Sequence, residues 1–166
     1  MNELLGKLIG MHEKELLRYA WIIVKDRMLA EDAVQNAFIA LTHSKQTIIG
    51  NHRAWLYCVV RNKCLNIIRK RKNRGELQLA EYHEFAEHDA SPSDIMTEAE
   101  RQLIFLRCLS LLKAQHREVL MLKIDQNKSY REISEITGLS VGNVGFILHT
   151  ATTTLRKLVK KELGES

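Results

Sequence analysis

Apolar residues recur at every third or fourth position along most of this chain, the spacing that lines one face of an α-helix. No stretch alternates apolar and polar residues as a half-buried strand does. The pattern predicts an all-α protein, in which residues 44–51 have no clear period and form a loop. Helices are predicted at residues 4–25, 30–43, 52–74, 97–112 and 114–124, and a helix-turn-helix at 129–158.

Residues 75–96 differ from the rest in composition. They contain glutamate and aspartate but no lysine or arginine, and they hold Pro92, the one proline of the chain. Such a segment suits an exposed, flexible linker rather than a packed element. We therefore expect two small helical domains, residues 1–74 and 97–166, joined by this linker, with the second ending in the helix-turn-helix.

The helix-turn-helix prediction rests on local signals. Ser129 and Glu132 have the spacing of a capping box, Gly138 suits the left-handed residue that ends a helix, and Ser140 can cap the next helix. A short glycine turn between two helices is typical of DNA-binding proteins, although an ordinary helical hairpin remains an alternative. The second helix has apolar positions at Val141, Val144, Leu148, Ala151, Leu155 and Leu158.

The helix predicted at 52–74 ends in the densest run of basic residues in the chain, which could contact phosphates or form a solvated helix end. Trp55 and Tyr57 precede the run. Aromatic rings beside a basic track suit single-stranded nucleic acid, because rings stack on unpaired bases, although a helical Trp is more often part of a core. The basic residues are Arg61, Lys63, Arg69, Lys70, Arg71, Lys72 and Arg74.

The helix predicted at 30–43 has a polar, acidic face, formed by Glu31, Asp32, Gln35 and Asn36, opposite Phe38. An acidic face on an otherwise basic domain favours docking of a protein rather than of nucleic acid. Alternatively, the acidic residues stabilise only the N-terminus of the helix.

Composition excludes several classes of protein. The seven histidines lack zinc-ligand spacing, and the three cysteines form no CxxC motif and suggest free thiols in a reducing cytoplasm. No apolar run is long enough to span a membrane, and no signal peptide is recognisable. No glycine-rich phosphate loop or nucleophile motif occurs. We expect a cytoplasmic, non-enzymatic protein without metal, cofactor or membrane insertion.

Two segments together resemble a known family. LAEDAVQNAFIAL at residues 29–41 and HRAWLYCVVRNKCLNIIRKRKNR at residues 52–74, followed by the helix-turn-helix, are similar to extracytoplasmic-function sigma factors of bacterial RNA polymerase. The resemblance covers nearly the whole chain. It implies that core RNA polymerase, promoter DNA (duplex and melted non-template strand) and an anti-sigma factor are partners of this chain.

The resemblance also implies roles for particular residues. The N-terminal domain would bind the polymerase clamp through Glu31, Asp32, Gln35 and Phe38. The loop at 44–51 would capture a flipped base of the minus-ten element, and the adjoining helix would support melting. The minus-ten contacts would come from Lys45, Asn51, His52, Arg53, Trp55, Arg61, Asn62, Arg69 and Lys70.

The C-terminal domain departs from the family pattern. Residues 141–154 contain no arginine or lysine, although the family's recognition helix is usually basic. Gly142 and Gly145 each cost this helix about 1 kcal/mol relative to alanine, which close approach to DNA or to a neighbouring helix would justify. We expect short-range base contacts, phosphate contacts and DNA shape to share recognition. The expected minus-thirty-five contacts are Arg131, Ser140, Asn143, Phe146, His149, Arg156 and Lys157.

The leading hypothesis is therefore a promoter-specificity subunit of RNA polymerase, which selects promoters and aids DNA melting. The first alternative is a stand-alone helix-turn-helix regulator that binds duplex DNA as a dimer. The second is an adaptor that docks on polymerase or on an inhibitor without reading DNA. An acidic face and an aromatic-basic helix favour the first reading, because a simple repressor needs neither.

Overall fold

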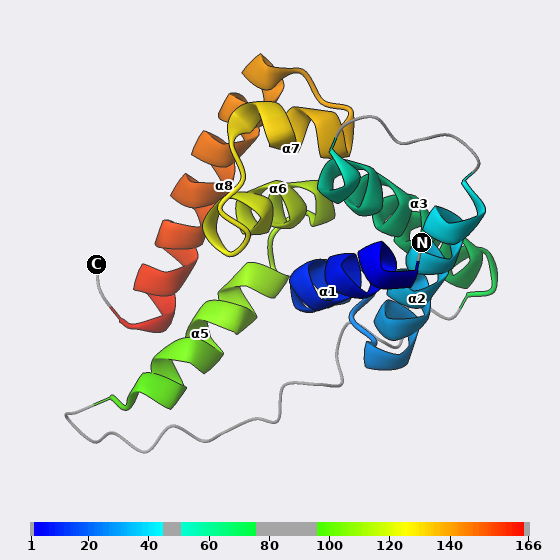
Figure 1. Cartoon of the computed structure of the whole chain (residues 1–166). Helices are drawn as coiled ribbons and strands as arrows, with labels where there is room; N and C mark the ends of the chain where they lie inside the picture. Colours follow the sequence, from blue (N-terminus) through cyan, green and yellow to red (C-terminus); the bar gives the residue numbers. More distant parts are fainter. Residues whose placement is uncertain (1, 45–50, 76–95, 165–166) are drawn as a thin grey trace.

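The computed structural model describes residues 2–44, 51–75 and 96–164. Within these residues the regular elements are all helices, so the all-α prediction is confirmed. The predicted linker lies almost wholly outside the described residues, as does most of the loop predicted at 44–51. The helices are α1 (Asn2–Val24), α2 (Arg27–His43), α3 (His52–Asn73), α5 (Glu98–Ser110), α6 (Ala114–Ile124), α7 (Tyr130–Thr137) and α8 (Val141–Glu162) (Figure 1).

Helices α1, α2 and α3 pack against one another and form the first group. The prediction that α2 begins at Ala30 was wrong, because the side chain of Asp26 accepts a hydrogen bond from the backbone N–H of Leu29 and starts the helix at Arg27. Asn51 caps α3 in the same way through the N–H of Ala54. The two caps fix the first residues of α2, which carries the predicted acidic face, and of α3, which ends in the basic run.

Helices α5 to α8 form the second group, in which α8 packs against α5, α6 and α7. Thr97 and Glu100 form a capping box at the start of α5. Ser129 and Glu132 form a second one at the start of α7, as the sequence predicts. The helix-turn-helix, α7 followed by α8, is therefore confirmed as the end of this group.

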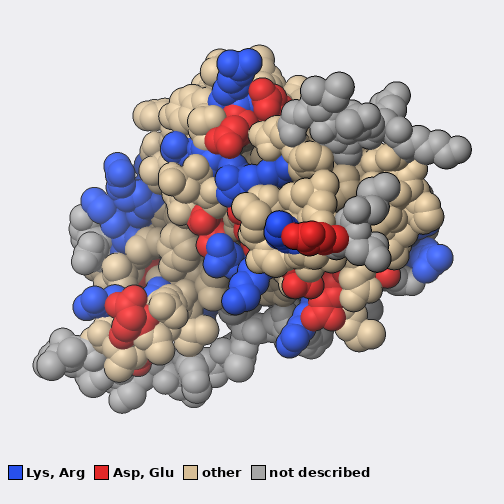
Figure 2. All heavy atoms as spheres, viewed as in Figure 1, with Lys and Arg blue, Asp and Glu red and all other residues tan. Residues whose placement is uncertain are grey.

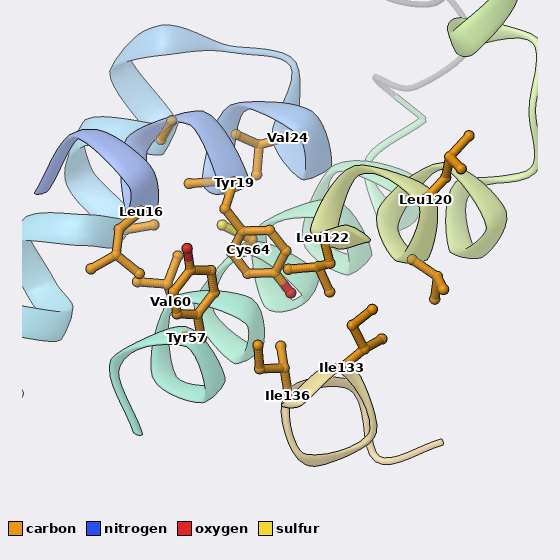
Figure 3. Packing of buried hydrophobic residues seen from close by; sticks show 14 of the residues in the cluster. Leu16, Tyr19, Val24, Tyr57, Val60, Cys64, Leu120, Leu122, Ile133 and Ile136 are labelled. Carbon is orange, nitrogen blue, oxygen red and sulfur yellow. The ribbon is translucent and has the colours of Figure 1, made fainter. Parts of the chain in front are cut away.

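The two groups share one core. Helix α6 contacts α1 and lies between α1 and α8, and α7 contacts α3 (Figure 1). Figure 3 shows side chains from α1, α3, α6 and α7 facing the same space. The Tyr19 and Tyr57 rings lie 5.1 Å apart between their centroids, at a tilted angle of 47°. The buried residues that surround them include Leu16, Val60, Cys64, Leu122, Ile133 and Ile136.

None of the described helices is both long and apolar enough to cross a bilayer. Cys64 and Cys108 are buried and Cys58 is partly buried, and all three thiols are free. Burial, together with the nearby Glu118 carboxylate, raises the pKa of the Cys64 thiol to about 12. The Cys64 thiol is therefore protonated and unreactive near neutral pH.

Candidate nucleic-acid interface

Arg61, predicted to contact the minus-ten element, lies between the two groups of helices. Its Nε donates a hydrogen bond of 2.7 Å to Oε1 of Glu118 on α6, and its Nη2 lies 3.4 Å from Oε2. The Tyr19 hydroxyl on α1 donates to the same Oε1 at 2.7 Å. The side chains of Arg61 and Glu118 are only 17% and 8% exposed. One buried carboxylate of the second group thus holds two side chains of the first.

The protonation states of this cluster follow from its surroundings. Burial, and then the Glu118 carboxylate, raises the pKa of Tyr19 well above its ordinary value, so the hydroxyl keeps its proton and donates. Burial alone would lower the pKa of Arg61, but the hydrogen bond to Glu118 and the charge of that carboxylate together outweigh it, and the net shift is upward. Arg61 therefore remains a cation that is paired inside the protein.

A second polar contact joins the groups nearby. The Tyr57 hydroxyl donates a hydrogen bond of 2.5 Å to Oε1 of Gln126, and the Nζ of buried Lys128 lies 4.2 Å from the centroid of the Tyr57 ring. Burial, and then the positive charge of Arg53, lowers the pKa of Lys128. On the surface, Arg18 and Asp125 form an ion pair of 3.3 Å. The contact between the two groups therefore combines apolar packing with two ion pairs, Arg61–Glu118 and Arg18–Asp125.

Two more cations of α3 are held by carboxylates of their own group. Arg53 donates to Glu15 through Nε at 2.9 Å and through Nη2 at 2.6 Å. Burial would raise the pKa of Glu15, but hydrogen bonds from Arg53 and His12 and the positive charges of Lys128 and Arg53 together outweigh it and lower the pKa. Arg71 pairs with Asp26 at 3.2 Å.

The remaining minus-ten candidates are distributed unevenly. Trp55 is half-buried and packs against the core, so its ring is only partly available for stacking. His52 is also half-buried, and Lys45 lies outside the described residues. The candidates exposed on the surface are Asn51, Asn62, Arg69 and Lys70.

The acidic face of α2 is largely exposed. Asp32 and Gln35 are exposed, and partly exposed Glu31 pairs with Arg27 at 2.8 Å. Phe38, predicted as part of the same polymerase-binding set, is buried in the core of the first group. Three polar side chains of the predicted set therefore reach the surface. Phe38 packs in the core beneath them and cannot itself contact a partner.

A groove of about 340 Å³ lies beside this face. Its walls include Trp21 of α1, Ala30 and Glu31 of α2, Met121 of α6 and Asp125, which directly follows α6. Both groups of helices thus contribute to it, and most of its exposed lining is apolar.

The turn between α7 and α8 has the predicted geometry. Gly138 adopts a left-handed conformation with φ of 75°, which ends α7. The Ser140 hydroxyl accepts a hydrogen bond of 3.1 Å from the N–H of Asn143 and caps α8. These two residues fix the direction in which α8 leaves α7.

Helix α8 buries one face and exposes the other. Asn143, Phe146 and His149 are exposed, as predicted for base contacts. Val141 was predicted to be apolar and buried but is 49% exposed, because it lies at the edge of the buried face, about 60° from its centre by helix geometry. The buried face consists of Val144, Ile147, Leu148, Ala151 and Leu155.

The cations predicted to hold phosphates are also exposed. Arg131 on α7 pairs with Glu135 at 3.4 Å, whereas Arg156 and Lys157 lie beyond the uncharged part of α8. Figure 2 shows lysine and arginine side chains gathered beside the C-terminal half of α8, with acidic and basic residues mixed over much of the same view. Positive charge therefore flanks the exposed, uncharged face of α8 rather than covering it.

The described residues contain no group of histidine, cysteine, aspartate or glutamate side chains that could hold a metal ion. Sequence reasoning missed Glu118, Gln126 and Lys128, which supply the buried polar contacts between the groups. Their charge or polarity suggests solvent exposure, and no local motif marks them as buried.

Comparison with known proteins gives the same order of parts. Residues 8–74 match the profile of Sigma-70 region 2, and residues 102–155 match that of Sigma-70, region 4. The ECF RNA polymerase sigma factor SigL of Mycobacterium tuberculosis (strain H37Rv) is 30% identical over 165 residues, which cover 97% of this chain and 91% of SigL. The RNA polymerase sigma factor YlaC of Bacillus subtilis is 27% identical over 169 residues, which cover 95% of this chain and 93% of YlaC.

A solved structure is similar in fold. The sigma factor RpoE of Bartonella quintana, solved in complex with the anti-sigma factor NepR, superposes with a TM-score of 0.72 at 22% identity. The match covers 96% of this chain and 98% of RpoE.

Proposed function

This chain belongs to the extracytoplasmic-function family of RNA polymerase sigma factors, and from that membership we propose how its parts divide the work of promoter recognition. Residues 1–74 serve as the region 2 domain, residues 97–166 as the region 4 domain, and residues 75–96 link them. The observation that carries the proposal is 30% identity to a named sigma factor along 97% of the chain. A stand-alone regulator would need no region 2 domain.

The acidic face of α2 binds core RNA polymerase in this proposal. Asp32 and Gln35 are exposed and adjacent on one helical face, and Glu31 extends it. Phe38 supports the face from the core. Carboxylates on a basic protein suit a basic protein partner, because complementary charge steers association and fixes register.

The exposed end of α3 tracks the melted minus-ten strand. Asn62, Arg69 and Lys70 are exposed and supply polar and cationic contacts. Arg61 can join them only after Glu118 releases it, since the Arg61 side chain is only 17% exposed while it holds the buried carboxylate. Engagement of Arg61 by DNA therefore requires separation of α3 from α6.

Helix α8 recognises the minus-thirty-five element. Asn143, Phe146 and His149 face the major groove, with Ser140 at the start of the helix. The phosphates on either side are held by Arg131, Arg156 and Lys157.

The remaining properties follow from the same assignment. The chain acts as a binding subunit and not as an enzyme, it works in the cytoplasm with the polymerase, and it needs no metal or cofactor. An anti-sigma factor is its regulatory partner, a proposal supported by the complex in which the fold relative RpoE was solved.

Reconstitution tests the proposal. The purified chain is mixed with core RNA polymerase, and transcription is measured on linear DNA templates. We expect co-purification with core and promoter-specific RNA, and we expect Asp32→Ala with Gln35→Ala to abolish both. Glu13→Ala, at an exposed position on α1, is the control and keeps both activities. A chain that binds duplex DNA tightly alone and starts no RNA with core would instead be a stand-alone regulator.

A further inference from the structure

We infer that α8 recognises A·T base pairs by placing the exposed ring of Phe146 against thymine methyl groups. The inference rests on the proposed role of α8 at the minus-thirty-five element and deepens it by naming the chemistry that is read. The Phe146 side chain is 68% exposed. It belongs to the first half of the helix, where a helix-turn-helix protein contacts base edges.

The position of Phe146 on the helix supports this role. Successive residues turn by about 100°, so Gly142, Phe146 and His149 lie within about 40° of the direction opposite the buried face. Phe146 is also the most exposed aromatic side chain among the described residues. A large ring near the centre of a solvent-facing surface is free to contact a base edge that comes against this face.

The chemistry of the surface selects the base. A guanine is usually read by the two donors of an arginine or by a lysine, and residues 141–154 contain neither. Thymine presents an apolar group in the major groove, its C5-methyl. Asn143, one turn before Phe146, has the donor and acceptor that pair with N7 and N6 of adenine. The available side chains therefore favour A·T pairs.

Two nearby hydroxyls are restricted in what they can read. Thr150 donates its hydroxyl to the backbone oxygen of Phe146 at 3.0 Å, and Thr154 donates to that of Thr150 at 2.9 Å. Because these protons are used inside the helix, the two hydroxyls can only accept hydrogen bonds in the groove, and donation to N7 of adenine falls to Asn143 or His149.

Gly142 allows the close approach that a methyl contact needs. A Cβ added at this position would meet no atom within 4 Å in the described part of the chain. Packing against a neighbouring helix therefore does not explain this glycine, although it costs the helix about 1 kcal/mol relative to alanine. An absent side chain beside Phe146 lets the backbone come near the base edges.

Replacement of thymine by uracil tests the inference, since it removes only the methyl group. Holoenzyme assembled from the full chain and core polymerase selects duplexes from a random-sequence pool, with core alone as the blank. Each thymine of the selected upstream element is then replaced by uracil. We expect about fourfold weaker binding at one or two positions, the factor that corresponds to one lost methyl contact.

Phe146→Ala should bind thymine and uracil duplexes equally. Leu111→Ala, which truncates a 62% exposed residue at the end of α5, is the matched control and should keep the discrimination. Gly142→Ala should stabilise the chain towards urea and weaken binding to the selected duplex. A response to uracil that persists in Phe146→Ala would overturn the inference.

The inference and the proposed function can fail separately. A selected upstream element that depends on Asn143 but tolerates uracil everywhere overturns the methyl readout and leaves recognition by α8 in place. If no upstream element is selected, or if Asn143→Ala and Phe146→Ala change nothing, the role of α8 fails and the inference fails with it.

Discussion

Helices α3 and α8 carry the two proposed DNA contacts, and their surfaces differ in both charge and exposure. Helix α3 is rich in cations, but Arg53, Arg61 and Arg71 are each paired with a carboxylate of the protein. Helix α8 has no cation from Val141 to Leu155, yet the centre of its outward face is exposed. One surface is charged and partly occupied, and the other is uncharged and open.

The difference shows that charge in a sequence is not the same as charge available to a ligand. A buried arginine that is paired must lose its partner before it binds phosphate, and the cost of leaving that partner unpaired opposes binding. An exposed apolar surface has no such internal competitor. In the proposed roles, promoter binding by α3 is therefore coupled to the arrangement of the two domains, whereas binding by α8 is not.

Removal of the Glu118 carboxylate should have the largest effect. Glu118→Ala leaves the Arg61 cation and the Tyr19 hydroxyl buried without an acceptor. We therefore expect the free energy of unfolding to fall by about 3–5 kcal/mol. Urea unfolding followed by circular dichroism measures the loss. Affinity for single-stranded DNA should rise at the same time, because Arg61 is released.

Glu3→Ala is the matched control for this prediction. Glu3 pairs with Lys7 at 2.9 Å on an exposed surface of α1, so its removal should change stability by about 0.5 kcal/mol or less. If Glu118→Ala and Glu3→Ala lowered the free energy of unfolding equally, the Glu118 contact would stabilise the chain no more than an exposed ion pair does.

The second largest effect should come from loss of the ion pair between Glu15 and Arg53 of α3, which acid weakens. The pKa of Glu15 is lowered from 4.5 in the folded chain, so its contribution to stability is present above pH 4.5 and disappears as the pH falls through the folded value. Glu15→Gln should cost about 1.5–3 kcal/mol at neutral pH, because charge-assisted hydrogen bonds to Arg53 are lost. The melting temperatures of the two proteins, measured against pH, should converge in acid, and parallel curves would contradict the assignment.

The helix-turn-helix should respond to its caps and not to its charges. Ser129→Ala removes the hydroxyl that accepts the N–H of Glu132 at 3.1 Å, and we expect a loss of about 1 kcal/mol in urea unfolding. Thr152→Ala, at an exposed position of α8, is the control and should have little effect. The hydroxyl cap is uncharged, so the loss of stability in Ser129→Ala should not depend on salt concentration. A loss that shrinks as salt is added would argue against the cap as its cause.

Addition of one cation to α8 should give the smallest effect and remove the contrast with α3. His149→Arg places a guanidinium on the exposed face, so binding to duplex DNA should become steeper in salt by about 0.9 in the log–log slope. Selectivity between sequences should fall, because phosphate contacts carry no sequence information. Titration of holoenzyme with matched and unmatched duplexes at several salt concentrations measures both. An unchanged slope would mean that this face does not approach DNA.

Local signals in the sequence predicted the local structure well. Ser129, Gly138 and Ser140 each act within a few residues of their own position, and the structure confirms all three. The start of α2 was misplaced for a related reason. Arg27 and Met28 are exposed and break the apolar period, so the cap formed by Asp26 determines the helix start and the buried positions do not.

The contact between the domains could not be predicted from the sequence. Tyr19 and Glu118 are separated by 99 positions, and neither belongs to a motif. Lys128 is almost completely buried, although lysine is rarely buried and this one follows a short polar stretch. Phe38 shows the opposite difficulty, since one apolar residue on an amphipathic helix can belong to the core or to a docking surface.

The groove between Trp21 and Met121 has a thermodynamic consequence. Its walls come from α1, α2 and α6, so a molecule that fills it binds only while the two domains remain together. By linkage, the binding free energy of such a molecule stabilises the arrangement in which the two domains are in contact. An apolar compound lodged there would keep Arg61 away from DNA without touching any residue that DNA touches.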